Sequence, residues 1–272
     1  MFRGSMQDIL CLCRCPVYFK DLSNLDNRCD CSNYNRNNAV YELHFEDSYN
    51  NRNSGSNFFI LDIGCGTGQY TLELAHILGH SSARVVGLDS SRGMVERARQ
   101  KDLCSNVHWI IGDAEKLPFK QKTFNAIYLT FVIHHIKRRA KAFRDFKRVL
   151  KSNGRLVIMT SSHARLRRTP YSLFPGVFAI DRMRFPTIPV LMRELKRAGF
   201  RNICHKLVVY GSEVLSLKRM LKNINGRFIS TFTLMSQQDF ENGCEQFKKI
   251  IKERYSGKIR RTVEANFVYA SR

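Results

Sequence analysis

The sequence predicts an α/β protein built on a doubly wound, mostly parallel sheet, and a few local patterns support this prediction. Apolar runs of strand length alternate with helical stretches over residues 58–160. The first run, Phe58–Leu61, leads into a loop with glycine at alternate positions that ends at Gly68. The second run, Val85–Leu88, ends at Asp89, 21 residues after that glycine. An acid at this point can accept hydrogen bonds from both hydroxyls of a ribose, as in doubly wound folds that hold a nucleoside.

The glycine loop follows Asp62 and contains Gly64, Gly66 and Gly68. Glycine adopts backbone conformations that other residues avoid, and it lets a ligand approach the main chain closely. The spacing also distinguishes between ligands, because a dinucleotide-binding loop has its third glycine three residues after the second. That position is occupied by Gln69, so the loop departs from the dinucleotide pattern.

Three further strands continue the alternation. The third predicted strand, Val107–Ile111, runs through a glycine into Asp113 and Ala114. Phe124–Thr130 is predicted as the fourth strand, and a basic helix and a turn separate it from the fifth, Arg155–Met159. Because the carboxyl ends of parallel strands meet at one edge of a sheet, we expect the residues after these strands to line a common site.

This order of motifs resembles the class I S-adenosylmethionine-dependent methyltransferases, within the broad family that includes the ubiquinone/menaquinone-biosynthesis methyltransferases. The resemblance covers about residues 58–160. It implies a Rossmann-like sheet of seven strands with an antiparallel last strand at Val263–Ala270, S-adenosyl-L-methionine as the cofactor, and an adenine-binding corner at Asp113. The residues expected to hold the cofactor are Asp62, Gly64, Gly66, Gly68, Asp89, Asp113, Ala114 and Thr130.

Two adjacent histidines, His134 and His135, are the candidate catalytic residues. A sulfonium methyl group is already activated, so the protein mainly aligns the acceptor and excludes water. A general base is needed only where the pKa of the acceptor demands it, and an imidazole with a pKa near ~6.5 could take that proton. The pair could instead pack beside the cofactor or cap the next helix. No metal is expected.

The net charge of +22 is confined to the C-terminal half of the chain. Residues 1–136 contain 14 basic and 14 acidic side chains, whereas residues 137–272 contain 31 basic and 9 acidic ones. Such asymmetry can steer an anionic partner, which could be nucleic acid, anionic lipid or an acidic metabolite. A solvated basic surface without a partner is equally compatible, because charge governs solubility and encounter rate rather than function.

Residues 1–57 are predicted to form a poorly ordered extension rich in cysteine and asparagine. Ten asparagines fall between Asn24 and Asn57, with little hydrophobic periodicity. Five of the nine cysteines also lie there, in a C-x-C spacing that familiar zinc sites do not use, so an inert extension and a metal clip remain alternatives. No apolar stretch approaches the ~20 residues of a membrane helix, and a cytoplasmic enzyme without a membrane span is therefore expected.

Residues 58–272 are predicted to form the methyltransferase domain, with the cofactor core at 58–160 and the acceptor side at 161–272. Between residues 161 and 186, three of the six prolines and four aromatic residues indicate an ordered insertion beside the acceptor.

Local signals place further elements beyond this insertion. Ile188–Ala198 is predicted to be a helix ended by Gly199, and Ile203–Tyr210 to be the sixth strand. Ser236 and Asp239 have the spacing of a capping box that opens another helix.

Three functions remain open on the sequence. The generic core and the compact insertion favour methyl transfer to a small-molecule acceptor. The basic clusters Lys137–Arg139, Arg165–Arg168 and Lys258–Arg261 favour methyl transfer to RNA, either tRNA or rRNA, although no RNA-binding module or base-methylation motif is visible. A cofactor-binding pseudo-enzyme is the third possibility, because the sequence shows no clear helix to cover the cofactor.

Overall fold

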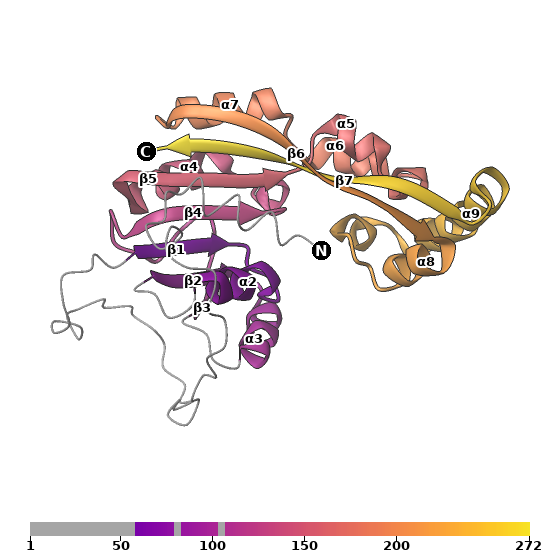
Figure 1. Ribbon diagram of the computed structural model, residues 1–272, viewed down its shortest axis with the longest axis horizontal. Helices are drawn as coiled ribbons and strands as arrows, with labels where there is room; N and C mark the ends of the chain where they lie inside the picture. The colour runs from indigo at the N-terminus through magenta and orange to yellow at the C-terminus, as the bar shows by residue number, and fades with distance from the viewer. Residues whose placement is uncertain (1–57, 79–82, 103–106) are drawn as a thin grey trace.

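The computed structural model describes residues 58–78, 83–102 and 107–272, which form one seven-stranded sheet in the order β3-β2-β1-β4-β5-β7-β6 (Figure 1). The first five strands pair in parallel, whereas β7 runs antiparallel to both β5 and β6. The predicted fold class is therefore confirmed, including the antiparallel last strand. The strands are β1 (Phe58–Ile63), β2 (Ala83–Asp89), β3 (Val107–Ile111), β4 (Phe124–Thr130), β5 (Leu150–Thr160), β6 (Arg201–Ser216) and β7 (Lys258–Ser271).

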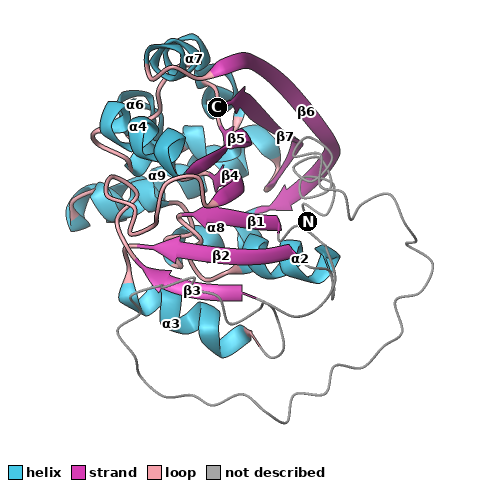
Figure 2. Cartoon of the chain, turned by 90° about the vertical axis from the view of Figure 1, so that its left-hand side faces the viewer, coloured by secondary structure: helices cyan, strands magenta, loops and turns pink. Residues whose placement is uncertain are grey.

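Helices cover both faces of this sheet (Figure 2). On one face, α2 (Gln69–Leu78) and α3 (Arg92–Lys101) join the apolar core through Leu74 and Val95. On the other, α4 (Arg139–Val149) and α7 (Ile188–Arg197) pack a second core through Phe143, Phe146 and Leu191. The central parallel strands are covered twice, which is why their sequences are continuous apolar runs rather than alternating ones.

Three strands are longer than the sequence predicts. The fifth was predicted over Arg155–Met159 after a turn, but β5 begins at Leu150 and includes that segment. The sixth was predicted over Ile203–Tyr210 and extends to Ser216, and the last was predicted over Val263–Ala270 and begins at Lys258. Only the final part of β7 also pairs with β5; the preceding part pairs with β6 alone. Outside the sheet this pair is a two-stranded ribbon with exposed residues on most of its surface, so it lacks the apolar pattern that identifies a core strand.

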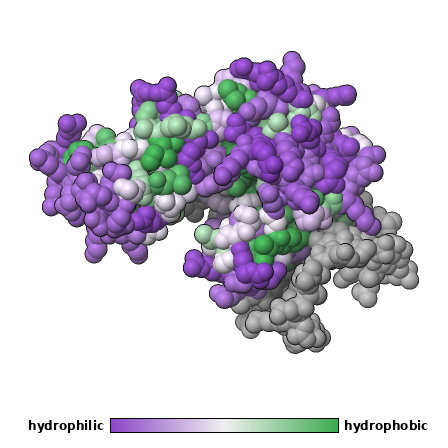
Figure 3. Space-filling model, turned by 180° about the vertical axis from the view of Figure 1, so that it is seen from behind, coloured by the Kyte–Doolittle hydropathy of each residue, from purple (hydrophilic) through white to green (hydrophobic). Residues whose placement is uncertain are grey.

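The ribbon carries a set of helices that we call the C-terminal lobe. It consists of α5 (His163–Arg168), η3 (Pro170–Leu173), α6 (Val177–Arg184), α8 (Leu217–Asn225), η4 (Ser230–Leu234) and α9 (Gln237–Tyr255). Most of these elements share a third apolar core, in which Phe174 lies against the rings of Phe232, Phe240 and Phe247. In Figure 3, apolar surface gathers where the lobe meets the rest of the molecule, and polar residues cover its outer end.

Two local predictions in this half are confirmed. α7 ends one residue before Ala198, and Gly199 follows it with φ of 83°. The Ser236 side chain accepts a hydrogen bond from the main-chain N–H of Asp239 at the start of α9 and donates one to its carboxylate. Both signals depend only on neighbouring residues, which makes them readable without the tertiary structure.

The predicted N-terminal extension and its cysteines lie outside the described residues. Among those that are described, no helix combines the length and the apolar character needed to cross a membrane.

Candidate functional site

The glycine loop joins β1 to α2 and owes its shape to packing on two sides. Gly64, Gly66 and Gly68 all have positive φ, at 74°, 55° and 77°. A Cβ added to Gly64 would lie 2.3 Å from Cγ2 of Val132, and one added to Gly68 would lie 2.6 Å from the ring of Trp109. A Cβ on Gly66 would meet nothing within 4 Å. The outer glycines therefore fit the loop against the fold, whereas the middle one faces open space where a ligand can approach the main chain.

Trp109 supports this loop from β3. Its ring lies under both Gly68 and Gly87, where added Cβ atoms would come within 2.6 and 2.8 Å. The indole Nε1 donates to the Asp102 carboxylate at 2.7 Å, and Arg99 donates to the Trp109 carbonyl oxygen at 2.9 Å. These contacts hold the ring in one orientation, and the ring in turn packs against the glycine loop and supports it.

Asp62 lies beneath the loop rather than at its open side. Its side chain is buried, with 1% of the residue exposed, and it accepts a hydrogen bond of 2.5 Å from the Thr71 hydroxyl at the start of α2. Burial raises the pKa of Asp62 to about 7, although the hydrogen bond from Thr71 and the nearby Tyr128 hydroxyl act in the opposite direction. The position suits a residue that ties the end of β1 to α2, so its predicted contact with a cofactor stays a prediction.

Asp89 and Asp113 lie at the carboxyl ends of neighbouring strands. One Asp89 oxygen accepts from the Gly66 N–H at 2.9 Å, and the other accepts from the Ser91 N–H at 2.8 Å. A carboxylate oxygen has capacity for further donors, so this arrangement orients Asp89 without saturating it. Asp113 is exposed and accepts from the Glu115 N–H at 2.8 Å, with Ala114 half-buried between them.

The residues at the end of β4 form another side of the candidate site. Phe131 has φ of 51°, a left-handed conformation that is strained for an aromatic residue, and its N–H donates to the Met159 carbonyl oxygen. Beside it, the buried hydroxyls of Thr130 and Thr160 have no hydrogen-bond partner among the described residues. Buried polar groups in proteins are normally paired, so these two hydroxyls indicate a place for a polar ligand.

His134 and His135 differ in their surroundings although they are adjacent in η2 (Ile133–His135). The His134 ring stacks on Phe185, with centroids 3.9 Å apart and planes 15° apart. Burial, together with His135 and Arg184, lowers the pKa of His134 to about 2. His135 is exposed, and burial of part of its ring and the Arg184 charge lower its pKa, while the Asp89 carboxylate acts in the opposite direction. Both rings are therefore neutral near pH 7.

Arg184 connects the C-terminal lobe to this histidine pair. Its guanidinium donates to the hydroxyls of Ser230 and Thr231 in η4, at 3.0 and 3.2 Å, and lies 3.3 Å from Nδ1 of His135. Arginine can only donate, so Nδ1 of His135 accepts and the proton of the neutral ring is on Nε2. His135 thus offers a hydrogen-bond donor on its other nitrogen, and the lobe is fastened beside the ends of β2 and β4.

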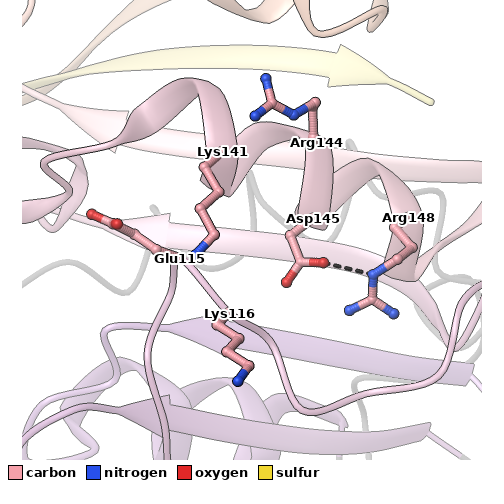
Figure 4. Close-up of a pocket in the computed structure, with 6 residues that line it drawn as sticks. All are labelled: Glu115, Lys116, Lys141, Arg144, Asp145 and Arg148. Carbon is pink, nitrogen blue, oxygen red and sulfur yellow. Dashed lines mark hydrogen bonds and ion pairs between the residues drawn. The ribbon is translucent and has the colours of Figure 1, made fainter.

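A separate hollow of about 270 Å³ lies against α4, lined by Glu115, Lys116, Lys141, Arg144, Asp145 and Arg148 (Figure 4). Asp145 accepts from Arg148 at 2.6 Å, and Arg148 also donates to the carbonyl oxygens of Leu117 and Phe119. Glu115 pairs with Arg138 at 2.5 Å. These side chains secure the segment between β3 and β4, and we assign no ligand to this hollow.

Comparisons with known proteins agree with this geometry. A family model described as a methyltransferase domain matches residues 61–158. The 2-phytyl-1,4-naphtoquinone methyltransferase of Thermosynechococcus vestitus is 30% identical over 170 residues, covering 53% of this chain and 73% of that protein. The demethylmenaquinone methyltransferase of Lactococcus lactis is 34% identical over 110 residues, or 39% of this chain and 43% of the relative, so the chain spans less than half of that enzyme.

A crystallised Anabaena variabilis protein, described as a methyltransferase of an antibiotic biosynthesis pathway, shares the fold with a TM-score of 0.59. The two chains are 21% identical over 80% of this chain and 92% of that one.

The fold and the site together define an S-adenosylmethionine-dependent methyltransferase of class I. The chain belongs to this family, within the broad group that includes the ubiquinone/menaquinone-biosynthesis enzymes. S-adenosyl-L-methionine is accordingly its cofactor. The residues present fit it, because the open face of Gly66, the carboxylate of Asp89 and the buried hydroxyl of Thr130 suit a ligand with a ribose and a polar amino-acid end.

Sequence reasoning missed several residues of this site. Val132 and Trp109 shape the glycine loop, Thr71 holds Asp62, and Arg184 with Phe185 surrounds the histidines. The Asp-to-Thr spacing of nine residues and the aromatic residue in β3 carry no motif of their own. Arg184 is 49 residues from His135, so only the tertiary structure brings them together.

Proposed function

We propose that this methyltransferase acts on a small-molecule acceptor that binds between the cofactor core and the C-terminal lobe. The observation that carries the proposal is the Arg184 bridge, which fastens η4 of the lobe to His135 beside the end of β4. An acceptor approaching the cofactor from this side would be bordered by both parts of the chain. The relatives named above are methyltransferases named for quinones, which favours a small molecule over RNA.

The predicted cofactor residues divide into two groups under this proposal. Asp89 would hold the ribose, Asp113 and Ala114 the adenine, and Gly66 and Thr130 the remaining polar groups. Asp62, Gly64 and Gly68 would act indirectly by fixing the loop, because packing or burial already accounts for each of them. The cofactor supplies a methyl group that needs no further activation, so the task of the chain is alignment and exclusion of water.

The two histidines have separate roles in this proposal. His134 packs against Phe185, and its depressed pKa makes it a poor proton acceptor. His135, with Nδ1 accepting from Arg184, would donate from Nε2 to an oxygen of the acceptor and hold it in line. A hydroxyl or carbonyl oxygen is the acceptor group that this donor suits.

The experiment that tests the function is a transfer assay with a labelled methyl group. The purified chain is incubated with S-adenosylmethionine and, in separate reactions, a quinone-precursor panel, a soluble metabolite extract and total RNA. We expect label in an organic-soluble or low-molecular-mass product. Label in RNA would instead support the RNA alternative, and cofactor binding without transfer to any pool would support the pseudo-enzyme.

A further inference from the structure

Five arginines that the sequence places far apart line one hollow of about 420 Å³ between α5, η3 and β7. They are Arg165, Arg167, Arg168, Arg260 and Arg261. The sequence shows them as two separate basic clusters almost a hundred residues apart. The fold brings the clusters together because β7 passes alongside α5 where the ribbon leaves the sheet (Figure 1).

The positive charges of this hollow exceed the carboxylates that pair with them. Arg168 pairs with Glu264 at 2.7 Å, and Arg261 pairs with Glu213 at 2.5 Å. No described carboxylate forms an ion pair with Arg165, Arg167 or Arg260. Glu213 also pairs with Arg219 at 3.0 Å, so the two carboxylates leave at least three of the five positive charges without an ion-pair partner in this part of the fold.

The uncompensated arginines are held in place by neutral groups. Arg165 donates to the Glu264 carbonyl oxygen at 2.6 Å and to the Ser161 hydroxyl at 2.5 Å. The Arg167 guanidinium lies 5.1 Å from the centre of the Phe178 ring, and Arg260 donates to Ser212. Burial, and then the Arg261 charge, lowers the pKa of Arg165, while the Glu264 carboxylate acts in the opposite direction, so repulsion between neighbouring arginines is only partly offset here. An anion in the hollow would relieve that repulsion.

We propose that this hollow binds the phosphate group of a small ligand. Guanidinium groups present forked pairs of N–H donors that match phosphate oxygens, and five arginines line the hollow, three of them without an ion-pair partner among the described carboxylates. A half-open hollow of about 420 Å³ with walls on a helix, a turn and a strand suits a compact anion better than the long open groove that a nucleic-acid strand requires. The hollow also adjoins the methyl-transfer site, since the Arg165 guanidinium lies 5.6 Å from the ring centre of Phe131.

The test measures anion binding directly and does not depend on methyl transfer. Inorganic pyrophosphate is titrated into the full-length chain by calorimetry, and saturable binding with one site is expected. The double variant Arg167→Ala with Arg260→Ala should bind about 100-fold more weakly, because each charge-assisted hydrogen bond is worth about tenfold. Arg193→Ala with Arg197→Ala removes the same charge from exposed positions on α7 and should leave the affinity nearly unchanged.

A second pair of measurements guards against misfolding and identifies the source of the phosphate. The double variant Arg167→Lys with Arg260→Lys keeps the charge and removes the forked N–H donors of the guanidinium groups. It should weaken pyrophosphate binding by about tenfold and have the same melting temperature as the unchanged chain. Displacement of pyrophosphate by glycerol 3-phosphate identifies a free phosphomonoester. Displacement by phosphatidylcholine vesicles containing phosphatidic acid, but not by phosphatidylcholine alone, identifies a lipid headgroup.

Three results would overturn the proposal. The first is the absence of saturable pyrophosphate binding to a folded chain. The second is an equal loss of affinity in the α7 control variant, since this would reduce the effect to net charge. The third is binding of total tRNA that depends on the hollow and has a steep salt dependence while pyrophosphate fails to compete, which would replace the small ligand with RNA.

Discussion

In the cofactor core the ligand-facing groups that we propose are glycines and short side chains at strand ends, whereas in the C-terminal lobe they are long side chains. Residues 1–136, which include the glycine loop, Asp89 and Asp113, carry no net charge, and the site that we propose there uses glycines and two carboxylates at strand ends. The lobe side carries the excess of basic residues and uses Arg165, Arg184 and their neighbours, each held by hydroxyls, carbonyl oxygens or aromatic rings. The first kind of site depends on close packing, and the second on which distant segments the fold brings together. The following experiments test this difference, from the largest expected effect to the smallest.

Gly64→Ala should have the largest effect, because it affects both backbone strain and packing. Alanine at φ of 74° is strained, and its Cβ would lie 2.3 Å from Val132. We expect the backbone strain and the overlap with Val132 together to lower the free energy of unfolding by roughly 2–5 kcal/mol. Gly66→Ala is the matched control, since it carries similar strain without the overlap. Chemical denaturation measures both variants, and equal losses would show that packing against Val132 does not shape the loop.

Asp62 should make stability depend on pH. Its pKa is raised from 3.8 to about 7 in the folded chain, so the native state keeps a proton that the unfolded state releases between these values. Stability from this residue is therefore fully present below about pH 4 and is lost as the pH rises through about 7, by on the order of 4 kcal/mol. Urea denaturation across this range should show the slope, and Asp62→Asn should flatten it. A slope unchanged in Asp62→Asn would assign the effect to another group.

Asp89→Ala should weaken S-adenosylhomocysteine binding by ~1.5–3 kcal/mol, the range for hydrogen bonds to a charged group. The variant also removes the acceptor of the Gly66 and Ser91 N–H groups, so part of the loss would come from the loop. Glu96→Ala, an exposed acid on α3, is the control. Calorimetry gives both dissociation constants. Full affinity in Asp89→Ala, or tight binding of NAD by the unchanged chain, would contradict the proposed site.

His135→Ala should lower kcat/KM by about tenfold, whereas His135→Gln should retain most of the activity because its amide can still donate. His76→Ala, at an exposed position on α2, serves as the control. The depressed pKa of His135 predicts a rate that is flat with pH above about 6.5. An equal loss of kcat/KM in His135→Ala and His135→Gln, with a shifted pH profile, would instead show that His135 acts as a general base.

Much of the core could be predicted from the sequence because its determinants are local. Strands β1 to β4, the second half of β5, the glycine loop and Asp89 each follow from a short segment and its spacing. The neighbourhood of Asp89 and Asp113 then follows from the rule that parallel strands end at one edge.

The C-terminal lobe could not be predicted in the same way. The residues that lengthen β6 and β7, Gly211–Ser216 and Lys258–Thr262, are mostly polar, so the length of both strands was underestimated. The contact between Arg184 and His135 joins residues 49 positions apart, and the arginine hollow joins segments almost a hundred apart. The sequence did identify the basic clusters, but only the fold shows that two of them share one hollow.

Trp109 gives this protein an internal fluorescent reporter. It is the single tryptophan of the chain, so the near-ultraviolet emission of the protein above tyrosine is the emission of one ring at one place. That ring lies directly under Gly68, in the glycine loop that we propose to bind the cofactor, and its N–H donates to the Asp102 carboxylate. A rearrangement of the loop on binding would change the surroundings of the indole and therefore its spectrum. Cofactor binding to the native chain can thus be followed optically, without a label and without knowledge of the methyl acceptor.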